Sequence, residues 1–160
     1  MIQFLMNRSD YVALRQTWLT IFGALSFSVL VYLLLAYFIE HSPKSRQVNS
    51  QTLATMTPII AFLGVAMLFA AVAYIRFRVD GKIGEEGRPI LLTPEQFQTQ
   101  SIVAFSLSEA CATFGLLLFF LGAPLQQLAY FALGTLFVNF AFILPRGLKF
   151  WRSYEKATTS

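Results

Sequence analysis

Four long apolar stretches constrain this chain more than any other feature. They cover about residues 17–39, 54–75, 101–122 and 125–144, and they contain a single charged side chain, Glu109. At a rise of roughly 1.5 Å per residue, each stretch is long enough to cross a hydrocarbon core of roughly 30 Å. The sequence therefore predicts an all-α integral membrane protein of one domain, with four transmembrane helices in an up-down arrangement.

Composition argues against the common soluble classes. The chain of 160 residues is 56% hydrophobic and only 12% charged, which fits neither a water-soluble domain nor a disordered chain. It has one cysteine, Cys111, and one histidine, His41. These are too few for an intramolecular disulfide, a zinc site or a bis-histidine haem, so we predict no metal and no cofactor.

Enzyme chemistry is not expected either. It would need a nucleophile, a base and a residue that orients the base. The nearest arrangement at membrane depth is Ser106 or Ser108 beside Glu109. Serines in membrane helices usually serve packing or bond back to their own chain. We therefore predict a non-enzymatic protein.

Basic residues predict the orientation of the helices. Lys44 and Arg46 follow the first apolar stretch. The other ten of the twelve lysines and arginines lie in the N-terminal segment, the loop 76–100 and the tail, namely Arg8, Arg15, Arg76, Arg78, Lys82, Arg88, Arg146, Lys149, Arg152 and Lys156. Because basic loops stay on the cytoplasmic side, we predict that both termini and the loop 76–100 are cytoplasmic. We expect a multi-pass protein of a prokaryotic inner membrane and no nucleic-acid partner.

Local patterns describe the ends of two helices. Thr93-Pro94-Glu95-Gln96 is a capping box with a proline at the first helical position, so the third helix should begin inside the loop. In the tail, aromatic residues alternate with bases over 147–156, which is typical of a helix at the membrane interface. A charged stop after Pro145 is the alternative. The candidates for contact with lipid headgroups are Arg76, Arg78, Lys149 and Arg152.

Glu109 is the one acid inside an apolar stretch. Counted from Ser101, it lies about 12 Å into the hydrocarbon, close to the midplane. An ionised carboxylate at that depth costs several kcal/mol. We therefore expect Glu109 to be protonated, ion-bound or hydrogen-bonded, and we take it as the candidate ion-binding residue.

Polar residues of three helices are expected near this carboxyl group. The short turn before Leu125 makes the third and fourth helices an antiparallel hairpin, in which Asn139 should lie opposite Glu109. The same count places Gly115 opposite Gly134, which would bring the two backbones close together. The remaining supporting residues are Ser106 and Thr113 on the Glu109 face of the third helix, and Ser26 and Ser28 at a similar depth on the first.

This arrangement has two interpretations. Glu109 could carry a proton or a cation, as intramembrane carboxyl groups often do. Alternatively, a neutral Glu109 could hydrogen-bond Asn139 and fasten the hairpin, since such interhelical bonds are worth about 0.6–2 kcal/mol.

The segment Glu109-Ala-Cys-Ala-Thr-Phe-Gly-Leu resembles the ion-carrying helix of the rotary ATPase proteolipid (c) subunit family. That family has a membrane carboxylate, commonly followed by alanine and then by an aromatic-Gly-Leu triplet. Arg88-Pro89 precedes Glu109 by 21 residues, which is similar to the polar loop of the family. The resemblance covers about residues 57–122 and implies that Glu109 binds the ion and that Arg88 is a loop position. The second apolar stretch departs from the pattern, because it has one glycine, Gly64, where the family is glycine-rich.

Two functions follow as hypotheses. The first is a small proteolipid-like membrane protein that binds or relays a proton or cation through Glu109, in an assembly with itself or with other membrane subunits. The alternative is a structural or accessory subunit of a larger energy-converting complex, respiratory or photosynthetic. The second hypothesis rests on a surface rich in phenylalanine, namely Phe119, Phe120, Phe131, Phe137, Phe140 and Phe142.

Overall fold

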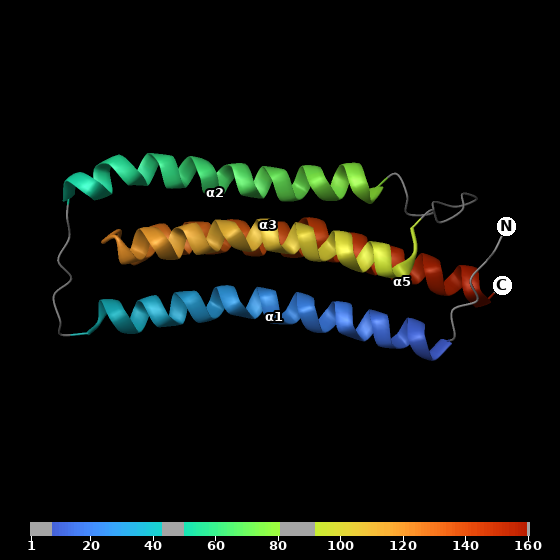
Figure 1. Ribbon diagram of the computed structural model, residues 1–160. Helices are drawn as coiled ribbons and strands as arrows, with labels where there is room; N and C mark the ends of the chain where they lie inside the picture. The colour runs from blue at the N-terminus through green and yellow to red at the C-terminus, as the bar shows by residue number, and fades with distance from the viewer. Residues whose placement is uncertain (1–7, 43–49, 81–91, 160) are drawn as a thin grey trace.

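The computed structural model describes residues 8–42, 50–80 and 92–159, and these are almost entirely helical. The elements are α1 (Arg8–Glu40), α2 (Ser50–Arg78), α3 (Pro94–Phe120), α4 (Leu125–Val138), the π-helix η2 (Asn139–Ile143) and α5 (Leu144–Thr159). Figure 1 shows α1, α2 and α3 side by side, with the chain returning behind α3 and ending in α5.

Four helical stretches are long and apolar enough to cross a membrane. They are Tyr11–Glu40, Gln51–Arg78, Pro94–Phe120 and Leu125–Lys156, with 27 to 32 residues each. This confirms the predicted all-helical class and a multi-pass membrane protein. In hydrocarbon a helix satisfies its own backbone hydrogen bonds, which is why apolar stretches of this length fold in this way.

The capping box predicted for the third helix is present. The side chain of Thr93 accepts a hydrogen bond from the backbone N–H of Gln96 at 3.3 Å, and the Gln96 side chain accepts one from the N–H of Thr93 at 3.2 Å. Pro94 occupies the first helical position, where no N–H is required. As predicted, α3 therefore begins well before the apolar stretch.

The turn between α3 and α4 fixes how these two helices pack. Gly122 has a φ of 107°, a left-handed conformation that suits glycine, and the N–H of Ala123 donates to the carbonyl of Leu118 at 2.9 Å. A Cβ at Gly115 would lie 2.6 Å from the Cβ atom of Phe131, three residues before Gly134, whereas one at Gly134 would meet Leu68 of α2. The prediction that the two glycines lie opposite each other is therefore wrong. The turn is centred before Pro124, which shifts the register by nearly one helical turn.

The fourth span stays helical through a proline. Pro145 has no N–H to give to the carbonyl of Ala141, and its ring crowds that carbonyl. The preceding turn widens into η2, in which the N–H of Leu144 donates to the carbonyl of Asn139. The chain then continues as α5, so the residues 147–156 form a helix that extends the fourth span (Figure 1).

Aromatic side chains attach α5 to the bundle. We call Tyr11, Trp18, Phe97, Phe150 and Trp151 the aromatic cluster, and all five are buried. The rings of Phe97 and Phe150 stack with centroids 4.1 Å apart, and the Tyr11 hydroxyl donates to the backbone carbonyl of Trp151 at 3.0 Å. The apolar face of α5 thus packs against α1 and the start of α3, and α5 is part of the folded core.

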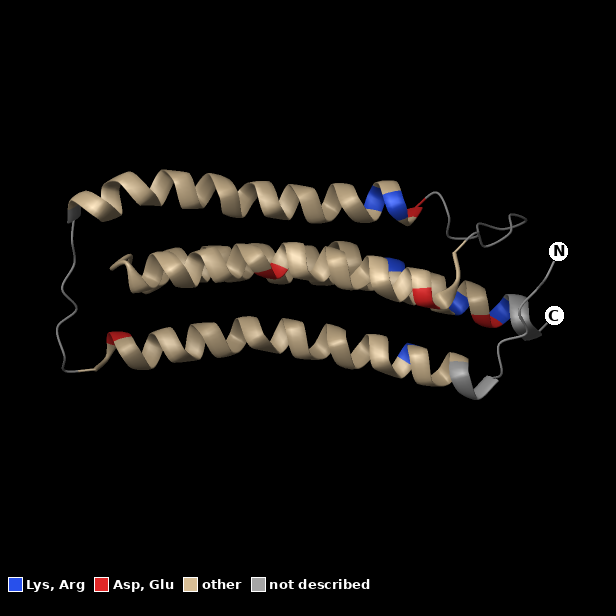
Figure 2. Cartoon of the chain, in the orientation of Figure 1, with Lys and Arg blue, Asp and Glu red and all other residues tan. Residues whose placement is uncertain are grey.

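Charged side chains gather at one end of the molecule. In Figure 2 the described lysines and arginines lie toward the end where α1 begins and α5 ends. Glu40 ends α1 at the opposite end, and Glu109 lies near the middle of α3. The predicted loop bases Lys44, Arg46, Lys82 and Arg88 lie outside the described residues.

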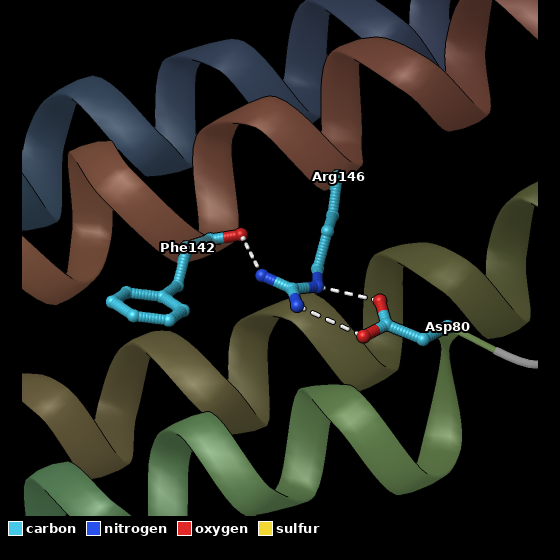
Figure 3. A network of polar contacts seen from close by, with 3 residues as sticks. All are labelled: Asp80, Phe142 and Arg146. Carbon is cyan, nitrogen blue, oxygen red and sulfur yellow. Dashed lines mark hydrogen bonds and ion pairs between the residues drawn. The ribbon is translucent and has the colours of Figure 1, made fainter.

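An ion pair joins the end of α2 to α5 at the charged end. Arg146 donates from Nε and Nη2 to the two carboxylate oxygens of Asp80, at 2.5 and 2.8 Å (Figure 3). Its third nitrogen, Nη1, donates to the carbonyl of Phe142 at 2.9 Å. The two-pronged geometry orients both side chains, which are only partly exposed.

The close contact between α5 and Trp18 leaves no room for a side chain at Gly147. A Cβ at Gly147 would run into the indole ring of Trp18, whereas a Cβ at Gly23 meets nothing within 4 Å. We expect Gly147→Ala to lower the free energy of unfolding by about 1–3 kcal/mol through overpacking. Gly23→Ala is the control and should stabilise the helix by about 0.5–1 kcal/mol. Unfolding of both variants in detergent measures this, and equal stabilities would contradict the packing of α5.

Candidate functional site

Glu109 lies near the middle of α3, and its carboxyl group faces α1. Its Oε1 atom accepts a hydrogen bond from the Ser28 hydroxyl at 2.5 Å and one from the Tyr32 hydroxyl at 3.1 Å. The residue is partly buried. Ser28 had been expected at this depth, but Tyr32 was missed. The sequence could have indicated Tyr32, because a residue four positions after Ser28 lies on the same face of the helix.

Asn139 does not pair with Glu109, which corrects the expected contact. The Asn139 side chain is fully buried, and its Oδ1 atom lies 2.6 Å from the hydroxyl of Ser108. Consecutive helical residues point about 100° apart. Ser108 therefore faces α4 and η2, while Glu109 faces α1. An antiparallel count gives the depth of a residue but not the side of the helix on which it lies.

A layer of buried polar side chains lies inside the bundle at nearly the depth of Glu109. We call Ser26, Ser108, Thr135 and Asn139 the inner polar layer. Ser108 lies at its centre, because Thr135 donates to the Ser108 carbonyl at 2.9 Å and Asn139 contacts the Ser108 hydroxyl. Ser26 is included in this layer because it lies one turn after Phe22 on α1. Phe22 in turn packs against Phe105 of α3 and Phe140 of η2.

The inner polar layer accounts for most of the buried polar side chains. Among the described residues five polar side chains are buried, and only Ser101 lies outside this layer. Within the described part of the chain, the Oγ atom of Ser26 and the Nδ2 atom of Asn139 have no hydrogen-bond partner. Asn139 is also the first residue of the π-helix, where the backbone of the fourth span departs from α-helical geometry. Buried polar groups at membrane depth are costly, so this layer constrains how the helices pack.

The other two predicted supporting residues lie on the outer side of α3. Ser106 and Thr113 are both exposed, and the Thr113 hydroxyl donates to the backbone carbonyl of Glu109 at 3.2 Å. A bond of this kind runs along the helix. Both hydrogen bonds to the carboxyl group come from residues of α1. Ser28 was among the expected partners, and Tyr32 was not.

The candidate lipid-contacting bases form two separate pairs. Arg76 and Arg78 are exposed at the end of α2, and Lys149 and Arg152 are exposed on α5. The two pairs therefore lie on different helices at the charged end (Figure 2). Arg88, which the proteolipid resemblance marked as a loop position, lies outside the described residues.

Within the described ranges no cluster of three or more His, Cys, Asp or Glu side chains could hold a metal ion. Glu109 is the one charged side chain within the four apolar stretches, and its carboxyl group has the hydroxyl groups of Ser28 and Tyr32 as neighbours. Such a group can take up or release a proton, or contribute one oxygen ligand to a cation.

The inner polar layer generates a matched pair of substitutions. Ser108→Ala removes a buried hydroxyl that contacts Asn139, and it should lower the free energy of unfolding by about 0.6–2 kcal/mol. Ser106→Ala makes the same chemical change on the exposed side of α3 and should stay within about 0.5 kcal/mol of the wild type. Equilibrium unfolding in mixed detergent micelles would compare the two. A larger effect at Ser106 would show that the assigned faces of α3 are wrong.

Comparisons with protein-family models, with curated proteins and with solved structures find no match to this chain. The likeness to the proteolipid family therefore stays a prediction from the segment around Glu109.

Proposed function

We propose that this chain is a small, non-enzymatic membrane protein in which Glu109 binds a proton or a cation at the middle of the bilayer. The observation that carries the proposal is the pair of hydroxyl groups, from Ser28 and Tyr32, directed at one oxygen of a carboxyl group at membrane depth. Acidic residues in membrane spans are rare and expensive, and they commonly mark ion or proton pathways.

The hydrogen-bonding capacity of the Ser28 hydroxyl favours a proton as the species bound at Glu109. The Ser28 hydroxyl lies 2.7 Å from the carbonyl oxygen of Leu25 and 2.5 Å from Glu109 Oε1. A hydroxyl has one hydrogen to donate and two lone pairs that accept. If Glu109 carries a proton and donates it to Ser28, then Ser28 donates to Leu25 and both contacts are satisfied. Tyr32 completes the chain by donating to the same carboxyl oxygen.

The proposed setting is an up-down bundle in a prokaryotic inner membrane. Both termini and the loop 76–100 are cytoplasmic in this proposal, since the described bases lie toward the end where α1 begins and α5 ends (Figure 2). The proposal also includes membership of an assembly, with further copies or with other membrane subunits. The similarity of the segment from Glu109 to Leu116 to proteolipid subunits favours this proposal.

Glu109→Gln tests the proposal, because glutamine keeps hydrogen-bonding atoms beside Ser28 and Tyr32 but cannot carry the ion. In reconstituted vesicles we expect loss of proton- or cation-dependent activity, loss of carbodiimide labelling at position 109, and loss of the infrared band of a protonated carboxyl group. The free energy of unfolding should change by less than about 1 kcal/mol.

Glu40→Gln is the matched control, since Glu40 lies at the end of α1 and is exposed. It should leave the activity, the labelling at position 109 and the infrared band intact. Ion handling by Glu109 is refuted if Glu109→Gln retains every measured activity.

A structural role is the second candidate, and one observation favours it. Both hydroxyl groups that bond Glu109 belong to α1, so the carboxyl group also ties α1 to α3. Phe119, which was predicted on the surface, is buried, whereas Phe120, Phe137 and Phe140 are exposed as predicted. Other large aromatic side chains are also turned outward, among them Phe62 at 73% and Phe69 at 72% exposure. They would suit lipid or the helices of a larger energy-converting complex equally well.

The mass of the native assembly separates the two candidates. After gentle detergent extraction, a homo-oligomer would support the proteolipid-like function. A stoichiometric complex with other membrane proteins would support the accessory role, particularly if the purified chain loses stability without them. Native mass spectrometry of the extracted material provides the measurement.

A further inference from the structure

The outer face of α5 carries a pocket of about 390 Å³ that neither proposed role of Glu109 uses. It is lined by Pro145, Leu148, Lys149, Arg152, Ser153 and Lys156. The lining residues include three bases and no acid. A small anionic group is therefore the chemistry that this pocket fits.

Helix geometry keeps the bases on one side of α5. Lys149, Arg152 and Lys156 follow one another at intervals of three and four residues, which places them on one face. On another face of the same helix, Phe150 and Trp151 are buried in the aromatic cluster. Because these rings hold α5 against α1 and α3, the bases are presented from a rigid support, which reduces the entropy lost on binding.

The pocket also lies at a suitable depth in the membrane. Leu144 ends the apolar stretch, and Lys149 and Arg152 follow it by about 7 and 12 Å along the helix axis. The headgroup layer begins where the hydrocarbon ends and is about 5–8 Å thick. Helical side chains lean toward the N-terminal end of their helix, which for α5 is the membrane side. The charged ends of these side chains therefore reach back to the level of lipid phosphates.

We propose that this pocket binds the phosphate group of an anionic phospholipid. Lys149 and Arg152 contact the phosphate, the guanidinium of Arg152 through two parallel hydrogen bonds, and the Ser153 hydroxyl donates a further bond. Pro145 and Leu148 form the apolar edge on the membrane side, where the lipid chains begin. This site is separate from Glu109, so its test does not depend on ion binding.

The experiment uses the full chain in nanodiscs with equal amounts of phosphatidylglycerol and phosphatidylcholine. Native mass spectrometry then counts the lipids that the protein retains. The wild type should retain phosphatidylglycerol in preference. The pair Lys149→Gln with Arg152→Gln should reduce this preference by about tenfold or more, because it removes the hydrogen-bonded contact with the phosphate in addition to the general attraction between surface bases and anionic lipid.

The comparison is the pair Arg76→Gln with Arg78→Gln, which removes the same charge from the two candidate headgroup contacts that lie on α2, outside this pocket. It should change the preference less than threefold. Equal losses in the two double variants, or no preference in the wild type, would overturn the proposal in favour of a diffuse surface charge. Displacement of the lipid by millimolar inorganic phosphate would overturn it in favour of a soluble phosphate. If either double variant misfolds by tryptophan fluorescence, Arg152→Gln and Arg76→Gln alone make the same comparison.

Discussion

Hydrocarbon offers no hydrogen-bond partner to a polar group, and most of this structure follows from that constraint. The backbone must satisfy itself, so the apolar stretches become continuous helices. Pro145 removes one backbone donor, and the chain widens into a π-helix over Asn139–Ile143 and continues as a helix. The same constraint applies to side chains. The buried hydroxyl groups of Ser108 and Thr135 form hydrogen bonds inside the bundle, and Glu109 faces two hydroxyl groups of α1.

Two sets of polar contacts lie on different faces of α3. Ser108 faces α4 and η2, and its neighbour Glu109 faces α1. The inner polar layer lies among buried apolar groups, where polar contacts constrain helix packing. The carboxyl group of Glu109, by contrast, is only partly buried. The same helix therefore combines a contact suited to packing with a group suited to chemistry.

At the charged end, the aromatic cluster and the Asp80–Arg146 ion pair both attach α5 to the other helices. Trp151 and Phe150 attach α5 to α1 and α3, while Arg146 attaches it to the end of α2. This helix would otherwise be a basic tail free to lie on the membrane surface. Its attachment holds a row of bases on the outer face of α5, where the pocket lies.

Local patterns in the sequence were sufficient to predict some features of this protein. The length and polarity of the four apolar stretches determined the helical class and the four candidate spans, since the bilayer admits no other use for such segments. Thr93 and Gln96 determined the start of α3, because a capping box involves only residues three positions apart. The position of Glu109 along its helix was also readable, as was the depth of Ser28.

Only the tertiary structure decided which faces meet. Asn139 pairs with Ser108 and not with Glu109, and Gly134 faces Leu68 and not Gly115. A rotation of 100° per residue and a turn centred before Pro124 were enough to change these partners. The helical continuation of the fourth span through Pro145 depends on a π-helix and on aromatic contacts with residues more than a hundred positions away. Sequence therefore determined what each helix contains and how deep it lies, and packing between helices determined what each side chain touches.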